Sequence, residues 1–120
     1  MAAIKSYSDL QQSKKLAEIL PLESADFCYI KTGVTSDNRI GVPEYQFKPM
    51  PHKDYSGESI GCWSLAALLS VIPNYKLSSE HNYHTCIAET SFGKETVAWF
   101  DNSVDACVAM IEKLNELNLL

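Results

Sequence analysis

The sequence has no run of basic residues. Its 10 Lys and Arg are scattered, and the longest basic cluster is the pair Lys14–Lys15. Together with 15 Asp and Glu they give a formal net charge of −5 at pH 7. A surface with this charge repels the phosphate backbone of nucleic acids. The composition therefore argues against DNA or RNA as the main partner.

The sequence also has no long hydrophobic run. The first residues, "MAAIKSYSDLQQSKKL", contain no continuous apolar stretch of the kind found in signal peptides. The longest apolar stretch, residues 63–73, is interrupted by Ser64 and Ser70 and has about half of the ~20 residues that span a bilayer. We therefore expect a protein of the cytoplasm without a membrane partner.

Closely spaced cysteine pairs are absent as well. The four cysteines, Cys28, Cys62, Cys86 and Cys107, lie far apart and form no CxxC motif. In a reducing compartment such cysteines are typically small buried hydrophobic residues. We expect them to lie in the core, and disulfide bonds are the less favoured alternative.

What is present is the composition of one globular domain over residues 1–120, with 46% apolar and 21% charged residues. Three helices are predicted. The first covers residues 6–20, with Ser6 as N-cap, and the second covers residues 62–73, is apolar all round and ends at Pro73. The third follows Asn102 or Ser103 as N-cap. The second helix is expected to be the buried central one.

Between these helices the hydrophobic period changes to that of strands. Strands are predicted at "FCYIK", at "VPEYQFK" and in a hairpin over residues 82–100 whose turn contains Gly93. Residues 32–41 and 48–61 are rich in Gly, Pro, Ser and Asp and are expected to be surface loops. The prediction is an α+β domain in the order α-β-β-α-β-β-α, with a small antiparallel sheet of about four strands packed against three helices.

Cys62 and His84 suggest one catalytic hypothesis. A cysteine at a helix N-terminus has a lowered thiol pKa, and a histidine on a following strand can act as its base. With Asp101 or Asn102 to orient the histidine, this layout looks like that of papain-type cysteine hydrolases. The gap of 22 positions between Cys62 and His84 is short, however, and the usual second cysteine before the nucleophile is missing. We favour the alternative that Cys62 is a small core residue.

The segment "HNYHTC" raises the question of a metal site. His81, His84 and Cys86 have the spacing H-x-x-H-x-C, which matches no standard structural zinc pattern. A fourth ligand would have to come from Cys62, Cys28 or His52. We therefore predict no metal and no other cofactor.

Aromatic and basic residues offer a binding site instead. Aromatic rings can stack on a flat ligand, and nearby cations can pair with its phosphates. Of these residues, Trp63 is the one with the strongest alternative as a core residue. The candidate ligand-binding residues are Arg39, Tyr45, Lys53, Tyr55, Trp63, His84 and Trp99.

Three segments of the sequence are distinctive: "YSDLQQSKKLAEILPLESADF", "CWSLAALLSVIP" and "DNSVDACVAMIEKLNELNLL". They closely resemble a group of short uncharacterised proteins encoded in gut Bacteroides genomes, prophages and related phages. The similarity covers both ends of the chain and its centre. The group has no assigned activity, so the resemblance transfers no catalytic residue.

The resemblance implies a small phage or prophage accessory protein that acts in the host cytoplasm. Our first hypothesis is a non-catalytic protein that sequesters a small host ligand, such as a nucleotide second messenger of bacterial immunity. The second is an inhibitor or adaptor that binds a host protein through an apolar patch. The third is the cysteine hydrolase of Cys62, His84 and Asp101. A homo-oligomer is compatible with each of them.

Overall fold

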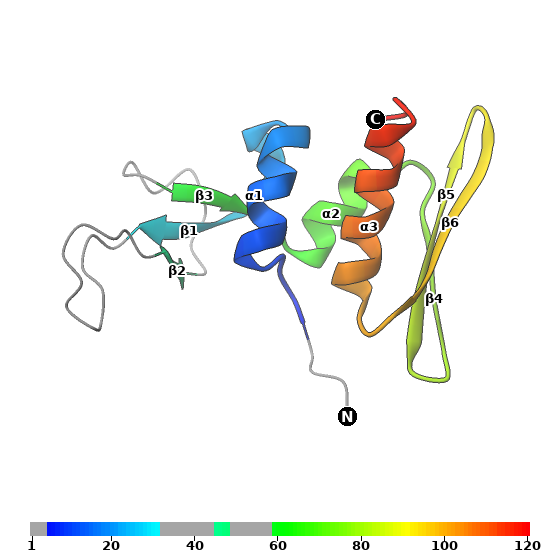
Figure 1. Ribbon diagram of the computed structural model, residues 1–120, viewed down its shortest axis with the longest axis horizontal. Helices are drawn as coiled ribbons and strands as arrows, with labels where there is room; N and C mark the ends of the chain where they lie inside the picture. The colour runs from blue at the N-terminus through cyan, green and yellow to red at the C-terminus, as the bar shows by residue number, and fades with distance from the viewer. Residues whose placement is uncertain (1–4, 32–44, 49–58) are drawn as a thin grey trace.

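Three helices lie between two small antiparallel sheets (Figure 1). The computed structural model describes residues 5–31, 45–48 and 59–120. The helices are α1 (Leu10–Ile19), α2 (Leu65–Val71) and α3 (Ser103–Glu116), and a short 3-10 turn covers Leu22–Ser24. The predicted α+β class, the three helices and their order in the chain are confirmed.

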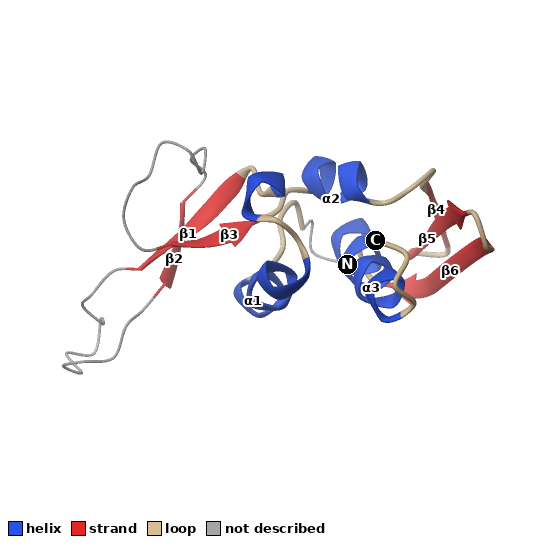
Figure 2. Cartoon of the chain, turned by 90° about the horizontal axis from the view of Figure 1, so that it is seen from above, coloured by secondary structure: helices blue, strands red, loops and turns tan. Residues whose placement is uncertain are grey.

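The strands form two sheets where one was expected. The first has the order β2-β1-β3, and the second has the order β4-β5-β6. The helices lie between the two sheets (Figure 2). Each sheet is built from strands that are close to one another in the chain. The bounds are β1 Phe27–Lys31, β2 Tyr45–Lys48, β3 Ser59–Cys62, β4 Lys76–Glu80, β5 Tyr83–Thr90 and β6 Gly93–Phe100.

The first helix begins later than predicted. Its N-cap is Asp9, whose side chain accepts a hydrogen bond from the backbone N–H of Gln12, while the Gln12 side chain accepts one from the N–H of Asp9. This reciprocal capping box fixes the start of α1. Ser6, the predicted cap, instead accepts a hydrogen bond through its carbonyl from the backbone of Leu65. The prediction of Asn102 as the N-cap of α3 is confirmed.

The second helix is shorter and less buried than predicted. Cys62 ends strand β3, and the side chain of Ser64 caps α2 by accepting a hydrogen bond from Ala67. Within α2 only Leu68 is fully buried, and Ser70 is exposed. The prediction of a buried central helix that begins at Cys62 was therefore wrong. The predicted end before Pro73 is confirmed.

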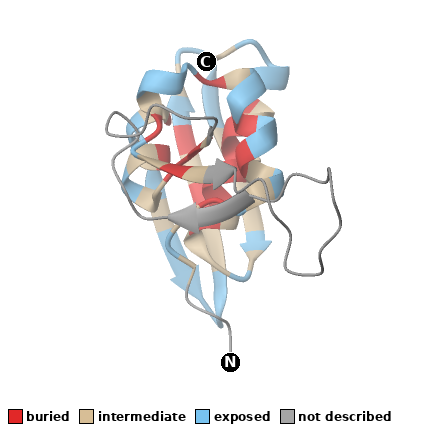
Figure 3. Cartoon of the chain, turned by 90° about the vertical axis from the view of Figure 1, so that its left-hand side faces the viewer, coloured by how far each residue is buried: buried red, intermediate tan, exposed pale blue. Residues whose placement is uncertain are grey.

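The third helix carries most of the core. One side of α3 is buried and packs against β5, β6 and α2. Figure 3 shows that the buried segments gather in the interior of the molecule and the exposed ones lie on the outside. From the other elements, Leu16, Leu68, Cys86 and Ala88 join the same cluster. Burial of this apolar stripe is the main source of stability for a helix of this kind. The buried residues of α3 are Val104, Ala106, Cys107, Val108, Met110, Ile111 and Leu114.

The sheet β4-β5-β6 is made of two consecutive hairpins. A two-residue turn, His81–Asn82, joins β4 to β5, and both residues have positive φ, 51° and 67°, as a type I′ turn requires. Gly93, with φ 122°, follows the turn between β5 and β6. One face of the sheet packs on α3, and the opposite face is turned away from the helices (Figure 2). None of the described helices is long and apolar enough to cross a membrane.

Candidate functional site

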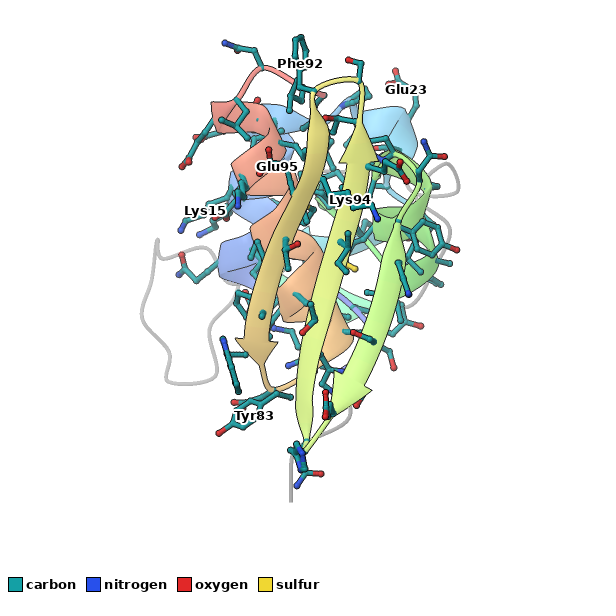
Figure 4. All side chains as sticks on the ribbon, turned by 90° about the vertical axis from the view of Figure 1, so that its right-hand side faces the viewer. Lys15, Glu23, Tyr83, Phe92, Lys94 and Glu95 are labelled. Carbon is teal, nitrogen blue, oxygen red and sulfur yellow. The ribbon has the colours of Figure 1, made fainter. Side chains whose placement is uncertain are left out.

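An exposed pair of aromatic rings marks one end of the sheet β4-β5-β6. Tyr83 begins β5, and Trp99 lies near the end of the neighbouring strand β6. Their ring centroids are 5.4 Å apart with planes inclined at 69°, an edge-to-face contact. Trp99 is 77% exposed and Tyr83 is 43% exposed. Tyr83 projects from the lower end of the sheet in Figure 4.

The backbone of Trp99 is strained. Its φ is +73°, in the left-handed region that bulky residues rarely adopt. The cause is a β-bulge in β6. His84 pairs with Phe100 and Cys86 pairs with Val97, so two residues of β6, Ala98 and Trp99, lie opposite the single residue Thr85 of β5. Val97 and Phe100 pack on the core on either side. The bulge thus turns the indole of Trp99 toward solvent, at a conformational cost of about 1–3 kcal/mol.

His84 follows Tyr83 in β5, and its side chain contacts helix α3. Its Nδ1 is 3.2 Å from Oγ of Ser103, the first residue of the helix. This contact connects the start of β5 to the start of α3. Because side chains alternate along a strand, His84 lies on the helix-facing side of β5 with Cys86 and Ala88, and Tyr83 lies on the opposite side. The exposed ring pair therefore includes the predicted residue Trp99 and does not include His84. Asp101 lies in the short connection between β6 and α3.

Cys62 does not have the environment of a nucleophile. It is fully buried at the end of β3, where its Sγ lies 3.9 Å from Oγ and 3.6 Å from the carbonyl oxygen of Ser8. Burial, with a smaller contribution from the charge of Asp26, raises the pKa of the Cys62 thiol to about 11. The predicted lowering of this pKa was wrong, because Cys62 ends a strand and the helix begins three residues later.

The proposed partner of Cys62 is also in the wrong place. β3, which carries Cys62, and β5, which carries His84, lie on opposite sides of the helices (Figure 1). The ring of His84 contacts Ser103. The papain-type arrangement of Cys62, His84 and Asp101 is therefore not formed.

The remaining cysteines are buried free thiols, as expected. A hydrogen bond between Cys86 and Cys107 raises the pKa of Cys107 and lowers that of Cys86. Within the described ranges, no three His, Cys, Asp or Glu side chains lie close enough together to hold a metal ion. His81 is 87% exposed and points to Glu80, at 3.6 Å from Nε2 to Oε1.

The other predicted binding residues do not extend the site. Trp63 is fully buried, and its Nε1 donates a hydrogen bond of 2.9 Å to Oγ of Ser24. It is a core residue and is not accessible to a ligand. Tyr45 begins β2, whose backbone alone is described. Arg39, Lys53 and Tyr55 lie outside the described residues.

Two features were missed by sequence reasoning. One is Tyr83 as the partner of Trp99, which the pairing of β5 with β6 could have indicated. The other is Phe92, which is 82% exposed at the tip of the hairpin β5–β6, at the opposite end of the hairpin from Trp99 (Figure 4). Open cavities of about 560 and 460 Å³ lie near this end and share Pro73 and Leu119.

No protein-family model matches the chain, and no significant match was found among curated proteins or solved structures.

Proposed function

We propose that this protein is a non-catalytic binding protein that docks onto another protein through Trp99 and Tyr83. The observation that carries the proposal is that Trp99 has a strained backbone, with positive φ, and is largely exposed to solvent. A large indole that is mostly in solvent adds little to the stability of the fold. A position that costs conformational energy without stabilising the fold is a candidate for binding.

The chemistry of the pair fits a protein partner better than a small ligand. Trp and Tyr are the residue types most enriched among the side chains that dominate binding energy at protein interfaces. Small-molecule sites are concave and enclose most of the ligand. The two cavities are open and lie toward the other end of the hairpin, while the indole of Trp99 is 77% exposed. The Tyr83–Trp99 pair is therefore suited to insert the indole into a pocket of a partner protein.

The resemblance to phage and prophage proteins suggests the source of the partner. If the chain belongs to that group, the partner is a protein of the bacterial host, and the chain acts as its inhibitor or adaptor. The net charge of −5 then favours a partner whose surface is basic around an apolar pocket.

A second candidate is the capture of a small flat ligand. The ring arrangement favours it, because two rings inclined at 69° form a corner in which a planar molecule could stack on the indole. A site for a small ligand would also need side chains that enclose the ligand on its other sides, and the described residues do not provide them.

The test of the proposal is quantitative affinity capture from a host lysate with three immobilised proteins: the wild type, Trp99→Ala and Phe92→Ala. Phe92 is the matched control, since it is equally aromatic and 82% exposed but lies at the other end of the hairpin. We expect one protein to be retained by the wild type and by Phe92→Ala, and to fall by at least ~10-fold with Trp99→Ala. A partner that Trp99→Ala retains in full would refute the proposal.

Native mass spectrometry of the freshly purified protein separates the two candidates. A bound compound released intact on denaturation, and absent from Trp99→Ala, would replace protein docking by ligand capture. The same spectrum without any bound compound, together with a captured host protein, supports docking.

A further inference from the structure

The sheet β4-β5-β6 has two outer edges, and they differ. At the β6 edge, Lys113 donates a hydrogen bond from Nζ to the carbonyl oxygen of Thr96, at 3.3 Å. The bulge at Trp99 also interrupts the regular backbone of this strand. A capped carbonyl and a bulge are both features that prevent another strand from pairing. The β6 edge is therefore protected.

The β4 edge has neither feature. Across the described residues, β4 pairs with β5 alone. Lys76, Ser78, Ser79 and Glu80 are all exposed along this edge. An open regular edge is a template for another strand.

The turn geometry shows which residues face the open edge. In a hairpin with a two-residue type I′ turn, the residues that flank the turn, here Glu80 and Tyr83, exchange backbone hydrogen bonds. Alternate residues then repeat this orientation, so Lys76 and Ser78 also point their backbone groups toward β5. The backbone N–H and C=O of Leu77 and Ser79 consequently point outward.

We propose that the β4 edge binds a second copy of this chain, strand to antiparallel strand, with the two-fold axis at Ser78. In this register Leu77 lies opposite Ser79 of the partner subunit, and these outward-facing residues exchange backbone hydrogen bonds. Lys76 lies opposite Glu80 of the partner subunit, and the reverse pair forms on the other side of the axis. The segment "KLSSE" is thus complementary to itself.

The charges favour this register over its neighbours. Lys76 and Glu80 fall at non-hydrogen-bonded positions, where the Cα atoms of an antiparallel pair are about 4.5 Å apart and the side chains are close. A shift of the axis by one residue, to Leu77 or Ser79, keeps two strands in contact but separates Lys76 from Glu80. Such a shift therefore loses both ion pairs.

The same geometry limits the assembly to a dimer. Joining two β4 edges makes one sheet of the order β6-β5-β4-β4-β5-β6, whose ends are the protected β6 edges. A symmetric contact of this kind uses the edge of both copies and closes. The open face of the sheet and the Tyr83–Trp99 pair are not consumed, so the dimer would present two copies of that pair.

The experiment is sedimentation equilibrium of the wild type and of two charge variants, Lys76→Glu and Glu80→Lys. Lys76→Glu leaves two acidic residues on the edge, and Glu80→Lys leaves two basic ones. We expect each variant alone to dimerise at least ~10-fold more weakly than the wild type. An equimolar mixture of the two should restore the dimer, because each edge is then opposite its complement. Lys94→Glu, a charge change on exposed β6, is the control and should leave the dimer intact.

Two further measurements make the outcome decisive. Circular dichroism confirms that each variant is folded, and Ser79→Pro removes an outward N–H without changing charge, so it should also weaken the dimer. A wild type that stays monomeric up to ~1 mM would overturn the proposal. A dimer that is insensitive to both charge variants, or a mixture that fails to restore it, would do the same and would indicate another interface.

Discussion

The exposed position of the Trp99 indole is set by the residues on either side of it in β6, whose side chains pack on the core. Val97 and Phe100 are fixed in the core, and the bulge between them leaves Trp99 with φ +73°. Among the described residues, its ring contact is an edge-to-face contact with Tyr83. The side chain can therefore be replaced without opening the core, which makes its roles in folding and in binding separable.

Replacing Trp99 by Gly should leave stability unchanged or raise the free energy of unfolding by up to about 1 kcal/mol, because Gly adopts positive φ without strain. Urea denaturation measures this difference. Ala98→Gly, one residue earlier, is the control and should cost about 0.5–1 kcal/mol, since its φ is not positive. A loss of more than about 2 kcal/mol in Trp99→Gly would show that the indole supports the fold.

Cys62 should react slowly with iodoacetamide in the folded protein. Its raised pKa of about 11 means that the thiolate forms only well above neutral pH, and its side chain is fully buried. Mass spectrometry of peptides should find all four cysteines unlabelled at pH 7 and labelled after denaturation. Rapid labelling of Cys62 alone, slowed by His84→Ala, would instead support the hydrolase hypothesis.

At the scale of the elements, a polar cluster joins the starts of α1 and α3. Lys5 Nζ lies 3.0 Å from Asp9 and 2.7 Å from Asp105, and Gln12 donates a hydrogen bond of 2.8 Å to Asp105. Burial raises the pKa of Asp105, but hydrogen bonds from Lys5, Gln12 and Asn102 outweigh it and hold the pKa below its ordinary value of 3.8. The ionised carboxylate is thus the stabilising form.

Asp105→Asn should lower the free energy of unfolding at pH 7 by about 1–2 kcal/mol, through weaker hydrogen bonds to Lys5 and Gln12. Because the folded pKa of Asp105 is depressed, its contribution is present above the ordinary carboxyl pKa and is lost as the pH falls through the folded pKa. The difference between variant and wild type should therefore shrink in acid. Denaturation curves from pH 7 to pH 2 test this, and a difference that is constant with pH contradicts it.

The elements that could be predicted are those with a strong local pattern. The strand "FCYIK" and the hairpin around Gly93 were correct, since alternation and a glycine turn specify them. β4 was missed because "KLSSE" has a single apolar residue, and β3 because the short "SIGC" lies in a Gly- and Ser-rich stretch. Both strands form through pairing with a neighbour, which a local pattern does not reveal.

At the scale of the whole molecule, one hydrophobic core contains side chains of the three helices and of the sheet β4-β5-β6. Leu68 of α2 belongs to the same cluster as the buried face of α3 and Cys86 of β5. Leu68→Ala should therefore cost about 2–5 kcal/mol through the cavity it leaves. Ser70→Ala, on the exposed side of the same helix, is the control and should be nearly neutral. A small effect of Leu68→Ala in denaturant titrations would mean that α2 is not part of the core.

The candidate site was predicted in part. Sequence reasoning selected Trp99 but did not place Tyr83 beside it, because that contact depends on the register of β5 and β6 and on the bulge in their pairing. For Cys62 a core position was the favoured alternative and for Trp63 it was the strongest one among the binding candidates, and both residues are buried. Their burial follows from the end of β3 before α2, a boundary that an apolar run does not mark.

The central claim, that Trp99 is the contact through which this protein binds another protein, is tested most directly by photo-cross-linking in host cells. A photoreactive phenylalanine analogue replaces Trp99 in one variant and Phe92 in the other, two exposed aromatic positions at opposite ends of one hairpin. We predict a covalent adduct with one host protein from position 99 and none from position 92. The absence of an adduct at position 99, or the same adducts from both positions, would contradict the claim.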